Sequence, residues 1–558
     1  MQVNRRAFVA GGAILASVAS TSHASTKKSG GGRAEAKALS SLEDYIDDHR
    51  ADWGIPGMTA CVVDRNGFTG TIMSGLADVD RRKKVGPDHL FQIGSITKMM
   101  TALAVWSLID EGKLSLDARL KDLMPGLVIR DGDKITLKHL LDHTSGLPSG
   151  APLIMDDGLW TEFKPGTKWS YCNLGYRIAG KIAAQADGRP FPECVEARVL
   201  RPLGMMQSIG AMRVADRSNY AQGYEPARMD RPVMRPGPMT AAPWVDYDGA
   251  SGCIASTASE MALFLRFLLA LADGKGGPVF SDEIAKQFLA QPADAPGWSE
   301  GTKYGNGIAH IELEDRNYLH HTGGMVSFSS SLHVDLEAGV AAFASGNVHY
   351  ALNYRPRDVT IYACELLRAA HEDAERPTPK LTKPKVEKPE KYAGRFTAES
   401  GAAFEIVAAG DKLTMRQNGY DTEMRPIGDD SFACSDEAYQ TTGLQFEMED
   451  DAVMRAWAGD VEFLQNPSGG FLPKASPELQ ALAGRYDSDD RWKLPVWVYA
   501  RNGKLCMRRV NYVSILTPMD GGDWRVGEGG TWARFDGVLG EKPQRLNISG
   551  TLYFRRFS

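Results

Sequence analysis

The spacing of hydrophobic positions changes several times along the chain, and each change predicts a different element. Residues 34–50 carry leucines and a tyrosine at helical spacing among acidic residues, which predicts an amphipathic helix. Residues 58–64 and 68–73 are strand-like and flank Asn66-Gly67, a strong hairpin signal. A helix, a hairpin and a further helical stretch favour an α+β fold in which helices pack on an antiparallel sheet.

The further helical stretch, from Met99 to Ile109, is apolar nearly all round, which predicts a buried helix. Ser95 and Lys98 fall in its expected first turn, where residues three apart share a face and can point into one cleft. A lysine among apolar side chains has a lowered pKa and can take a proton from a serine. The pair is therefore a candidate nucleophile and base, although an isolated Ser-x-x-Lys more often marks a helix cap and a solvated lysine.

The pattern changes again after a helix expected at residues 359–371, where residues 375–389 are rich in proline and lysine and predict an extended linker. Short motifs then repeat, and short alternating runs between Gly/Asp turns predict two small antiparallel β-barrels. The matches pair Ala393-Gly394-Arg395-Phe396 with Ala483-Gly484-Arg485-Tyr486, Gly410-Asp411-Lys412-Leu413 with Asn502-Gly503-Lys504-Leu505, and Phe446 and Phe463 with Phe535 and Phe554.

At the start of the chain, Arg5-Arg6 and Phe8 precede a short apolar stretch and the small-residue pattern Ser22-His23-Ala24. This resembles a twin-arginine export signal and implies a periplasmic protein, the alternative being a frayed helical terminus. The apolar stretch is too short to span a bilayer, so no stable membrane span is expected after cleavage. The expected division is a signal at 1–24, a first domain at 35–372, a linker at 373–390, a barrel at 391–465, a second linker at 466–479 and a second barrel at 480–558.

Composition narrows the possible functions. The 558 residues are 43% hydrophobic and 24% charged with a net charge of −6, which is typical of a soluble multidomain protein and makes nucleic acid an unlikely partner. The seven cysteines are scattered and predict neither a disulfide framework nor a zinc site. No metal-binding, P-loop or dinucleotide motif occurs, so we expect no metal and no cofactor.

Four blocks, in order, carry a resemblance to the penicillin-recognising serine hydrolases of the class C β-lactamase group. They are residues 91–98, residues 135–148, residues 165–176 with Tyr171-Cys172-Asn173, and residues 319–324. The resemblance covers roughly residues 35–370 and implies a β-lactamase/transpeptidase-like domain, an antiparallel sheet packed by helices with an all-helical lobe. Together with the two barrels, it implies an architecture similar to three-domain D-aminopeptidases.

The resemblance also implies site roles. Ser95, Lys98 and Tyr171 would be catalytic, and the residue types agree, because an ammonium at Lys98 would lower the pKa of the Tyr171 phenol and make it a base. Asn173 would orient the substrate and tether Lys98. His321, Thr322 and Gly323 would bind substrate, and the backbone N–H groups of Ser95 and Gly324 would form the oxyanion hole.

His321 stands where penicillin-directed members usually carry lysine, so we expect the site to lack a constant charge for a substrate carboxylate. The expected activity is therefore that of a peptidase, aminopeptidase or amidase that acts through an acyl-enzyme on Ser95, on small peptides that can include D- or non-standard residues. An esterase and a β-lactamase of the same family remain alternatives, as does a non-catalytic periplasmic peptide or cell-wall sensor. Oligomeric state stays open.

Other catalytic arrangements find less support in the sequence. No Gly-x-Ser-x-Gly elbow occurs, which disfavours an α/β-hydrolase triad. His143 precedes Thr144-Ser145-Gly146, a setting that favours a helix end and a turn over a catalytic base. His139 is expected to be a packed helix residue.

Overall fold

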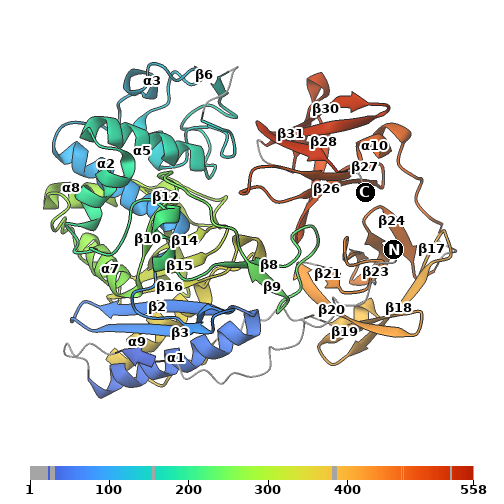
Figure 1. Cartoon of the computed structure of the whole chain (residues 1–558), viewed down its shortest axis with the longest axis horizontal. Coiled ribbons are helices and arrows are strands. Elements are labelled where there is room, and N and C mark those ends of the chain that lie inside the picture. Colours follow the sequence, from blue (N-terminus) through green and yellow to red (C-terminus); the bar gives the residue numbers. More distant parts are fainter. Residues whose placement is uncertain are drawn as a thin grey trace, which may run out of the picture.

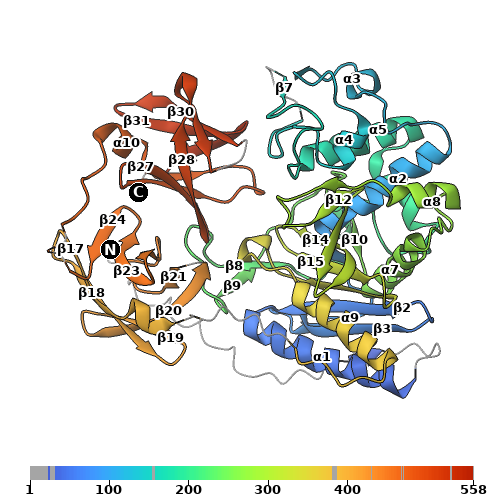
Figure 2. The same ribbon diagram turned by 180° about the vertical axis from the view of Figure 1, so that it is seen from behind.

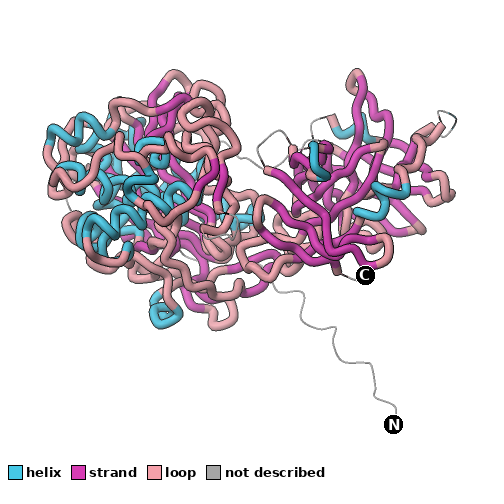
Figure 3. The backbone as a smooth tube through the Cα atoms, turned by 90° about the horizontal axis from the view of Figure 1, so that it is seen from above, coloured by secondary structure: helices cyan, strands magenta, loops and turns pink. Residues whose placement is uncertain are grey.

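The protein consists of a large mixed domain and two β-barrels, seen in Figure 1 and from behind in Figure 2. This computed structural model describes residues 23–25, 32–153, 158–379, 386, 388–428, 430–466, 468, 470–527 and 531–556. Viewed from above in Figure 3, the helices gather in the large domain and the strands of the barrels form a second body beside it. The predicted fold class, an α+β β-lactamase-like domain followed by two antiparallel barrels, is confirmed.

The centre of the large domain is an antiparallel sheet. Its strands, in spatial order, are β1 (His23–Ser25), β3 (Thr69–Asp78), β2 (Gly57–Asp64), β16 (Val340–Gly346), β15 (Ser329–Asp335), β14 (Arg316–Gly324), β13 (Ile308–Leu313), β12 (Lys303–Gly305) and β11 (Ala293–Asp294), with β4 (Lys83–Lys84) beside β3. Every residue of β2 is buried, because Cys61 and Val63 face one hydrophobic core and Ala60 and Val62 face the other. The predicted hairpin is therefore a central part of a sheet covered on both faces.

Helices cover both faces of this sheet. The helices α1 (Arg33–Trp53) and α9 (Arg357–His371) pack together on one face, while α7 (Ala258–Ala272) lies against the other (Figure 1). The remaining helices are α2 (Thr97–Asp110), α3 (Leu120–Leu123), α4 (Leu137–Leu141), α5 (Asn173–Asp187), α6 (Phe191–Val195) and α8 (Asp282–Phe288). Helix α2 has twelve buried residues out of fourteen, as its apolar sequence predicts, and forms the centre of the helical lobe.

Each barrel is closed and contains eight described strands. The first comprises β17 (Gly394–Ala398), β18 (Ala403–Ala409), β19 (Lys412–Gln417), β20 (Tyr420–Gly428), β21 (Ser431–Cys434), β22 (Leu444–Glu449), β23 (Ala452–Ala458) and β24 (Val461–Leu464). The second comprises β25 (Gly484–Asp487), β26 (Val496–Arg501), β27 (Lys504–Arg509), β28 (Tyr512–Pro518), β29 (Trp524–Val526), β30 (Trp532–Leu539), β31 (Lys542–Ile548) and β32 (Thr551–Arg555). The repeated motifs fall on equivalent first and third strands, so the barrels are structural copies.

One predicted match within the repeat is shifted by one residue. Ala398 pairs with Phe463 in the first barrel, while in the second barrel Asp487, the residue equivalent to Thr397, pairs with Phe554. The structural equivalent of the buried Phe463 is therefore Tyr553, which is also buried, and Phe554 points outward. A one-residue slip moves a strand side chain to the opposite face, and the sequence match alone did not fix that register.

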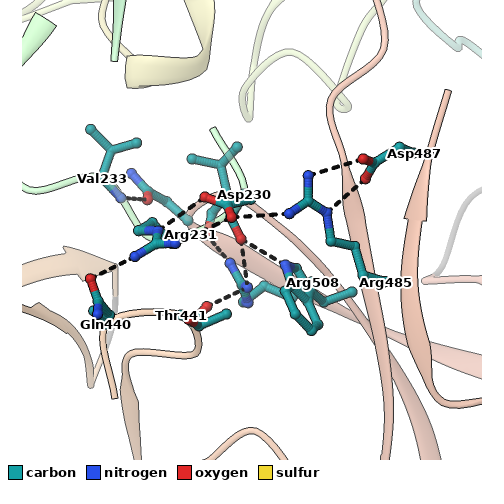
Figure 4. Close-up of polar contacts among 11 residues, drawn as sticks. Asp230, Arg231, Val233, Gln440, Thr441, Arg485, Asp487 and Arg508 are labelled. Atoms are coloured by element: carbon teal, nitrogen blue, oxygen red, sulfur yellow. Dashed lines mark hydrogen bonds and ion pairs between the residues drawn. The ribbon is translucent and has the colours of Figure 1, made fainter. Parts of the chain in front are cut away.

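The barrels contact the large domain through more than the linker. The loop between β8 (Tyr224–Pro226) and β9 (Met239–Ala241) reaches both barrels, where Arg231 binds Gln440 of the first and the Val233 N–H donates to Asn511 of the second (Figure 4). The extended linker predicted from the sequence is therefore accompanied by direct contacts between the domains. The cause is this loop, which carries no local sequence signal for a partner so distant along the chain.

Several boundaries differ from those expected. Helix α2 begins at Thr97, and Ser95 lies in a short 3₁₀ turn, Gly94–Ile96, just before it. A short helix, α10 (Pro477–Leu482), occupies the end of the expected second linker, with Ser476 as its cap. The expected export signal lies outside the described residues, except for its last two residues, which fall in the strand β1. Within the described ranges, no helix is long and apolar enough to cross a membrane.

All seven cysteines are buried and unpaired. Burial raises the pKa of each thiol, so the reactive thiolate form is suppressed at every position. The expectation that they form no disulfide framework agrees with this arrangement.

Because the two barrels are equivalent, substitutions at matched core positions should destabilise both barrels to a similar degree. Leu413 and Leu505 occupy the same place on β19 and β27, and both are fully buried. Leu413→Ala and Leu505→Ala should each lower the free energy of unfolding of the barrel concerned by about 2–5 kcal/mol, because each leaves a cavity. Denaturant unfolding measures this, with the exposed Tyr420→Ala as control. A loss below about 0.5 kcal/mol in only one barrel would contradict the equivalence.

Candidate active site

Ser95 is placed by a glycine on one side and the edge of β14 on the other. Gly94 has φ +55°, and a Cβ atom there would lie 2.8 Å from the backbone nitrogen of Gly324. A Cβ on Gly323 would lie 2.0 Å from the Ile93 carbonyl oxygen. Only glycine allows so close an approach of two backbones, and this approach brings the turn with Ser95 against the end of β14.

Lys98 is completely buried on the first turn of α2, and its amine reaches three oxygens. Its Nζ lies 3.0 Å from Ser95 Oγ, 2.8 Å from Asn173 Oδ1 and 2.8 Å from the Ser251 carbonyl oxygen. The structure thus brings together three residues that the sequence predicted for one site. Ser251 contributes through its backbone, a contact that residue type does not signal.

The surroundings of Lys98 favour its neutral form. Burial lowers the pKa of Lys98 well below its ordinary value, and no carboxylate among the described residues offsets this effect. A neutral amine has two N–H donors, which match the two carbonyl acceptors of Asn173 and Ser251. Its lone pair is then left to accept the hydroxyl proton of Ser95.

Tyr171 lies across the same site, with its ring centre 4.9 Å from Lys98 Nζ. Burial raises the pKa of Tyr171 above its ordinary value, and a hydrogen bond with Ser95 offsets this only in part. The expectation that Lys98 would lower this pKa is therefore wrong. That expectation assumed that Lys98 is charged. Because the enclosed Lys98 amine favours its neutral form, the Tyr171 phenol remains protonated and can donate a proton.

His143 lies behind Tyr171. It follows the end of α4 with φ +60°, its Nδ1 accepts the Cys172 N–H at 3.1 Å, and its ring centre is 4.4 Å from that of Tyr171. Among the described residues its Nε2 has no hydrogen-bond partner. His139, in contrast, forms a capping box with Thr136 at the start of α4. The capping box accounts for His139, whereas His143 keeps one buried ring nitrogen without a partner among the described residues.

His321 is buried on β14, and both its ring nitrogens have protein partners. Nδ1 lies 2.7 Å from the Thr322 carbonyl oxygen, and Nε2 lies 2.9 Å from the Tyr304 hydroxyl. Because a carbonyl only accepts, Nδ1 carries the proton and Tyr304 donates to Nε2. Burial lowers the pKa of His321 well below its ordinary value, so the ring is neutral at pH 7.

These residues line a cavity of about 1050 Å³. Its lining includes Ser95, Tyr171, Asn173, His321, Thr322 and Gly324 from the predicted set. Gly323 lies behind this wall against Ile93, so it shapes the wall without lining it. The cavity is large enough for a peptide-sized ligand.

Two arginines in the cavity were not predicted. Arg355 and Arg357 both line it, and Arg355 lies against Gly324, since a Cβ on that glycine would be 2.2 Å from Arg355 Nη2. Burial lowers the pKa of Arg355 to about 10, which leaves it charged at pH 7. The expectation that His321 leaves the site without a constant charge is therefore wrong. The cation comes from the segment before α9, which has no local motif.

The second barrel forms the opposite wall. Cavity-lining residues between β25 and β26 include Ser488, Asp489, Asp490, Trp492 and Lys493. The Trp492 carbonyl accepts a hydrogen bond from the Tyr350 hydroxyl at 3.1 Å. The ring centre of Trp492 lies 5.0 Å from that of Tyr247. Trp298, from the strand region of the large domain, completes the wall near His321. In the described part of the chain, no group of three or more metal-ligating side chains is arranged to hold a metal ion.

Comparison with known proteins bears on the family and the fold of the chain. The family model described as Beta-lactamase matches residues 42–364. Penicillin-binding protein 4 of Amycolatopsis lactamdurans is 29% identical over 54% of this chain and 83% of its own length, and Esterase EstB of Burkholderia gladioli is 31% identical over 29% and 49%. The octameric penicillin-binding protein homologue from Pyrococcus abyssi shares the fold with a TM-score of 0.53 and 20% identity, over 86% of this chain and 99% of that one.

The buried amine predicts a specific pH dependence of stability. A folded-state pKa below the ordinary lysine value of about 10.4 means that the unfolded chain binds more protons, so the contribution of Lys98 to stability rises with pH. The unfolding free energy of the wild type minus that of Lys98→Met should increase by up to about 1.4 kcal/mol per pH unit between pH 7 and 9. Urea unfolding at each pH measures it. A difference independent of pH would show that Lys98 is charged in the folded protein.

Proposed function

The chain belongs to the Beta-lactamase family and is a serine hydrolase with the β-lactamase fold, and from this premise we propose that it hydrolyses small peptides or amides through an acyl-enzyme on Ser95. The observation that carries this proposal is the position of Lys98. Its amine lies 3.0 Å from the Ser95 hydroxyl, and its other two hydrogen-bonding positions are occupied by carbonyl oxygens.

In the proposed acylation step, the neutral Lys98 amine accepts the Ser95 proton as Oγ attacks the substrate carbonyl carbon. The carbonyl electron pair moves onto oxygen, and the N–H groups of Ser95 and Gly324 stabilise the resulting oxyanion. Tyr171, a protonated phenol, donates its proton to the leaving nitrogen and regains one from Lys98. The C–N bond then breaks and the amine leaves.

In the proposed deacylation step, a water attacks the acyl-enzyme. Its proton passes to the Tyr171–Lys98 pair, and the ester bond to Ser95 breaks as Oγ regains a proton. Asn173 keeps Lys98 in place throughout, and His321 holds Tyr304 and thereby the wall beside Tyr171. Thr322 lies on the cavity wall beside the acyl group, and Gly323 keeps that strand close to Ser95.

The same residues can hydrolyse an ester, and a curated relative is named as an esterase. Others are named Beta-lactamase. A substrate panel of D- and L-aminoacyl amides, short peptides, p-nitrophenyl esters and a penicillin distinguishes the classes. Amide turnover supports our proposal, turnover of esters alone identifies an esterase, and steady opening of penicillin identifies a β-lactamase. Stoichiometric labelling of Ser95 without turnover identifies a sensor.

We further propose export to the periplasm by the twin-arginine route. The support is the Arg5-Arg6 pair followed by a short apolar stretch and a small-residue cleavage pattern. Replacement of both arginines by lysine should retain the protein in the cytoplasm, as cell fractionation would show.

Nucleophile identity gives the first test of the proposed reaction. Ser95→Ala should abolish labelling by a fluorophosphonate or penicillin probe and all turnover, because only the attacking oxygen is removed. Mass spectrometry of the labelled peptide and circular dichroism of the variant measure the loss and the intact fold. The exposed Ser218→Ala serves as the control and should label like the wild type. Normal labelling of Ser95→Ala would refute the assignment.

Arg355 predicts which end group the substrate carries. Because Arg355 supplies a permanent cation beside Gly324, the wild type should prefer a substrate with a free carboxylate there over its carboxamide. Arg355→Gln should lower kcat/KM for the carboxylate member by about ten- to a hundred-fold, the effect of one charge-assisted hydrogen bond of about 1.5–3 kcal/mol. The carboxamide should change little. Equal losses on both members would assign Arg355 a structural role instead.

A further inference from the structure

The loop between β8 and β9 lies where the two barrels and the large domain meet (Figure 4). Asp230 is the residue of this loop with most contacts to the second barrel. Its carboxylate pairs with Arg485 of β25 at 3.1 Å, and its carbonyl accepts from Trp497 at 2.6 Å and Arg508 at 3.3 Å. A single residue of the large domain therefore binds three strands of the barrel.

Arg485 connects Asp230 to the wall of the active-site cavity. Besides Asp230, its guanidinium binds Asp487 through two hydrogen bonds of 2.8 and 2.9 Å. Asp487 ends β25, and all but Arg491 of the next six residues, 488–493, line the cavity that contains Ser95. Figure 4 shows Asp230, Arg485 and Asp487 in one continuous network. The start of the cavity-lining segment is thus fixed to the large domain by the ion pairs that Arg485 forms with Asp487 and Asp230.

The charges around Asp230 keep this network ionised. Burial acts to raise the pKa of Asp230, but the hydrogen bond and charge of Arg231 and the charge of Arg485 outweigh it and hold the pKa below its ordinary value. Asp230 is largely buried and Arg485 is partly exposed, so their pair is screened less than a surface ion pair. Bidentate pairing with Asp487 also fixes the plane of the guanidinium.

The cavity-lining segment itself has few polar ties to the large domain. These include the hydrogen bond from Tyr350 to the Trp492 carbonyl and the ring contact between Trp492 and Tyr247, and Trp492 also packs against the hydrophobic core of the large domain. These contacts lie at the far end of the segment, away from Asp489 and Asp490. The near end is held within the barrel by the Ser488 hydroxyl, which donates to the Leu552 carbonyl, and by the pair of Arg485 and Asp487. Of these residues, Arg485 also binds the large domain, through Asp230.

We propose that Asp230 is a positioning residue for substrate selection: through Arg485 and Asp487 it holds the segment 488–493 of the second barrel in the wall of the cavity that contains Ser95, where a peptide substrate long enough to cross the cavity would contact it. This inference rests on the proposed hydrolase function and adds a specificity determinant to it. Asp230 contacts neither Ser95 nor the substrate, and its effect is limited to ligands long enough to reach the second barrel.

The test compares a short and a long substrate in Asp230→Asn, which keeps the shape of the side chain and removes its charge. KM for a tetrapeptide amide should rise about tenfold with kcat nearly unchanged, as expected for the loss of one charge-assisted contact. The kcat/KM for p-nitrophenyl acetate, which is too short to reach the segment, should stay within twofold. Asp230→Glu should restore most of the tetrapeptide KM, because it restores the charge.

Arg534→Gln is the matched control. It breaks an exposed ion pair with Asp523 in the same barrel, away from the loop between β8 and β9, and should leave both substrates unchanged. Hydrogen exchange followed by mass spectrometry supplies a readout besides activity. In Asp230→Asn, exchange should rise in residues 484–493 and remain unchanged in the barrel core around Leu505 and Leu546.

The outcomes separate this inference from the hydrolase proposal. Loss of both substrates to the same degree in Asp230→Asn, or unchanged KM for the tetrapeptide, would overturn the positioning role. Unchanged exchange in residues 484–493 would also overturn it. If the wild type turns over neither substrate, the hydrolase proposal fails, while the exchange experiment still decides whether Asp230 anchors the segment. Arg485→Lys, which keeps the charge but loses the bidentate geometry, replaces Asp230→Asn if that variant does not fold.

Discussion

The candidate site depends on the hydrogen bonds that hold a buried lysine amine among neutral oxygen atoms. Lys98 sits on an otherwise apolar helix and is fully buried, so its charged form would lack both water and a carboxylate. The oxygens of Asn173 and Ser251 come from two other segments and accept its two protons. Helices α2 and α5 and the loop before α7 must therefore stay packed together for Lys98 to face Ser95.

The same enclosure sets the state of the neighbouring groups. Tyr171 remains a phenol because its own burial outweighs its hydrogen bond with Ser95, and His321 remains neutral for a related reason. A permanent positive charge near Ser95 comes instead from Arg355, which stays charged even though burial lowers its pKa. Proton transfer and charge recognition thus belong to different residues of the site.

Local patterns predicted much of this architecture. Helical spacing located α1, α2 and α9, the Asn66-Gly67 turn located the central hairpin, and the repeated motifs at Gly394 and Gly484 located both barrels, because each of these signals acts over a few residues. Register within the barrels was harder, as Tyr553 shows, because pleat alternation depends on the neighbouring strand. Ser95, Lys98 and Asn173 were found together because their motifs are short and ordered.

The features of the site that local patterns did not predict depend on contacts between segments that are distant along the chain. Arg355, Asp230 and the cavity-lining residues of the second barrel have no signature in their own sequence neighbourhoods, and only the folded chain brings them to the site. The direction of the Tyr171 pKa was also missed, since a motif gives residue types and not their burial.

The seven enclosed thiols have a consequence for the stage of folding at which such a chain can meet an oxidant. Each is protected only while the cores around it are closed, since an extended chain would present all seven to any oxidant at once. Random pairing among seven sulfurs would then trap misfolded isomers. A polypeptide built this way tolerates an oxidising compartment best when it arrives there already folded.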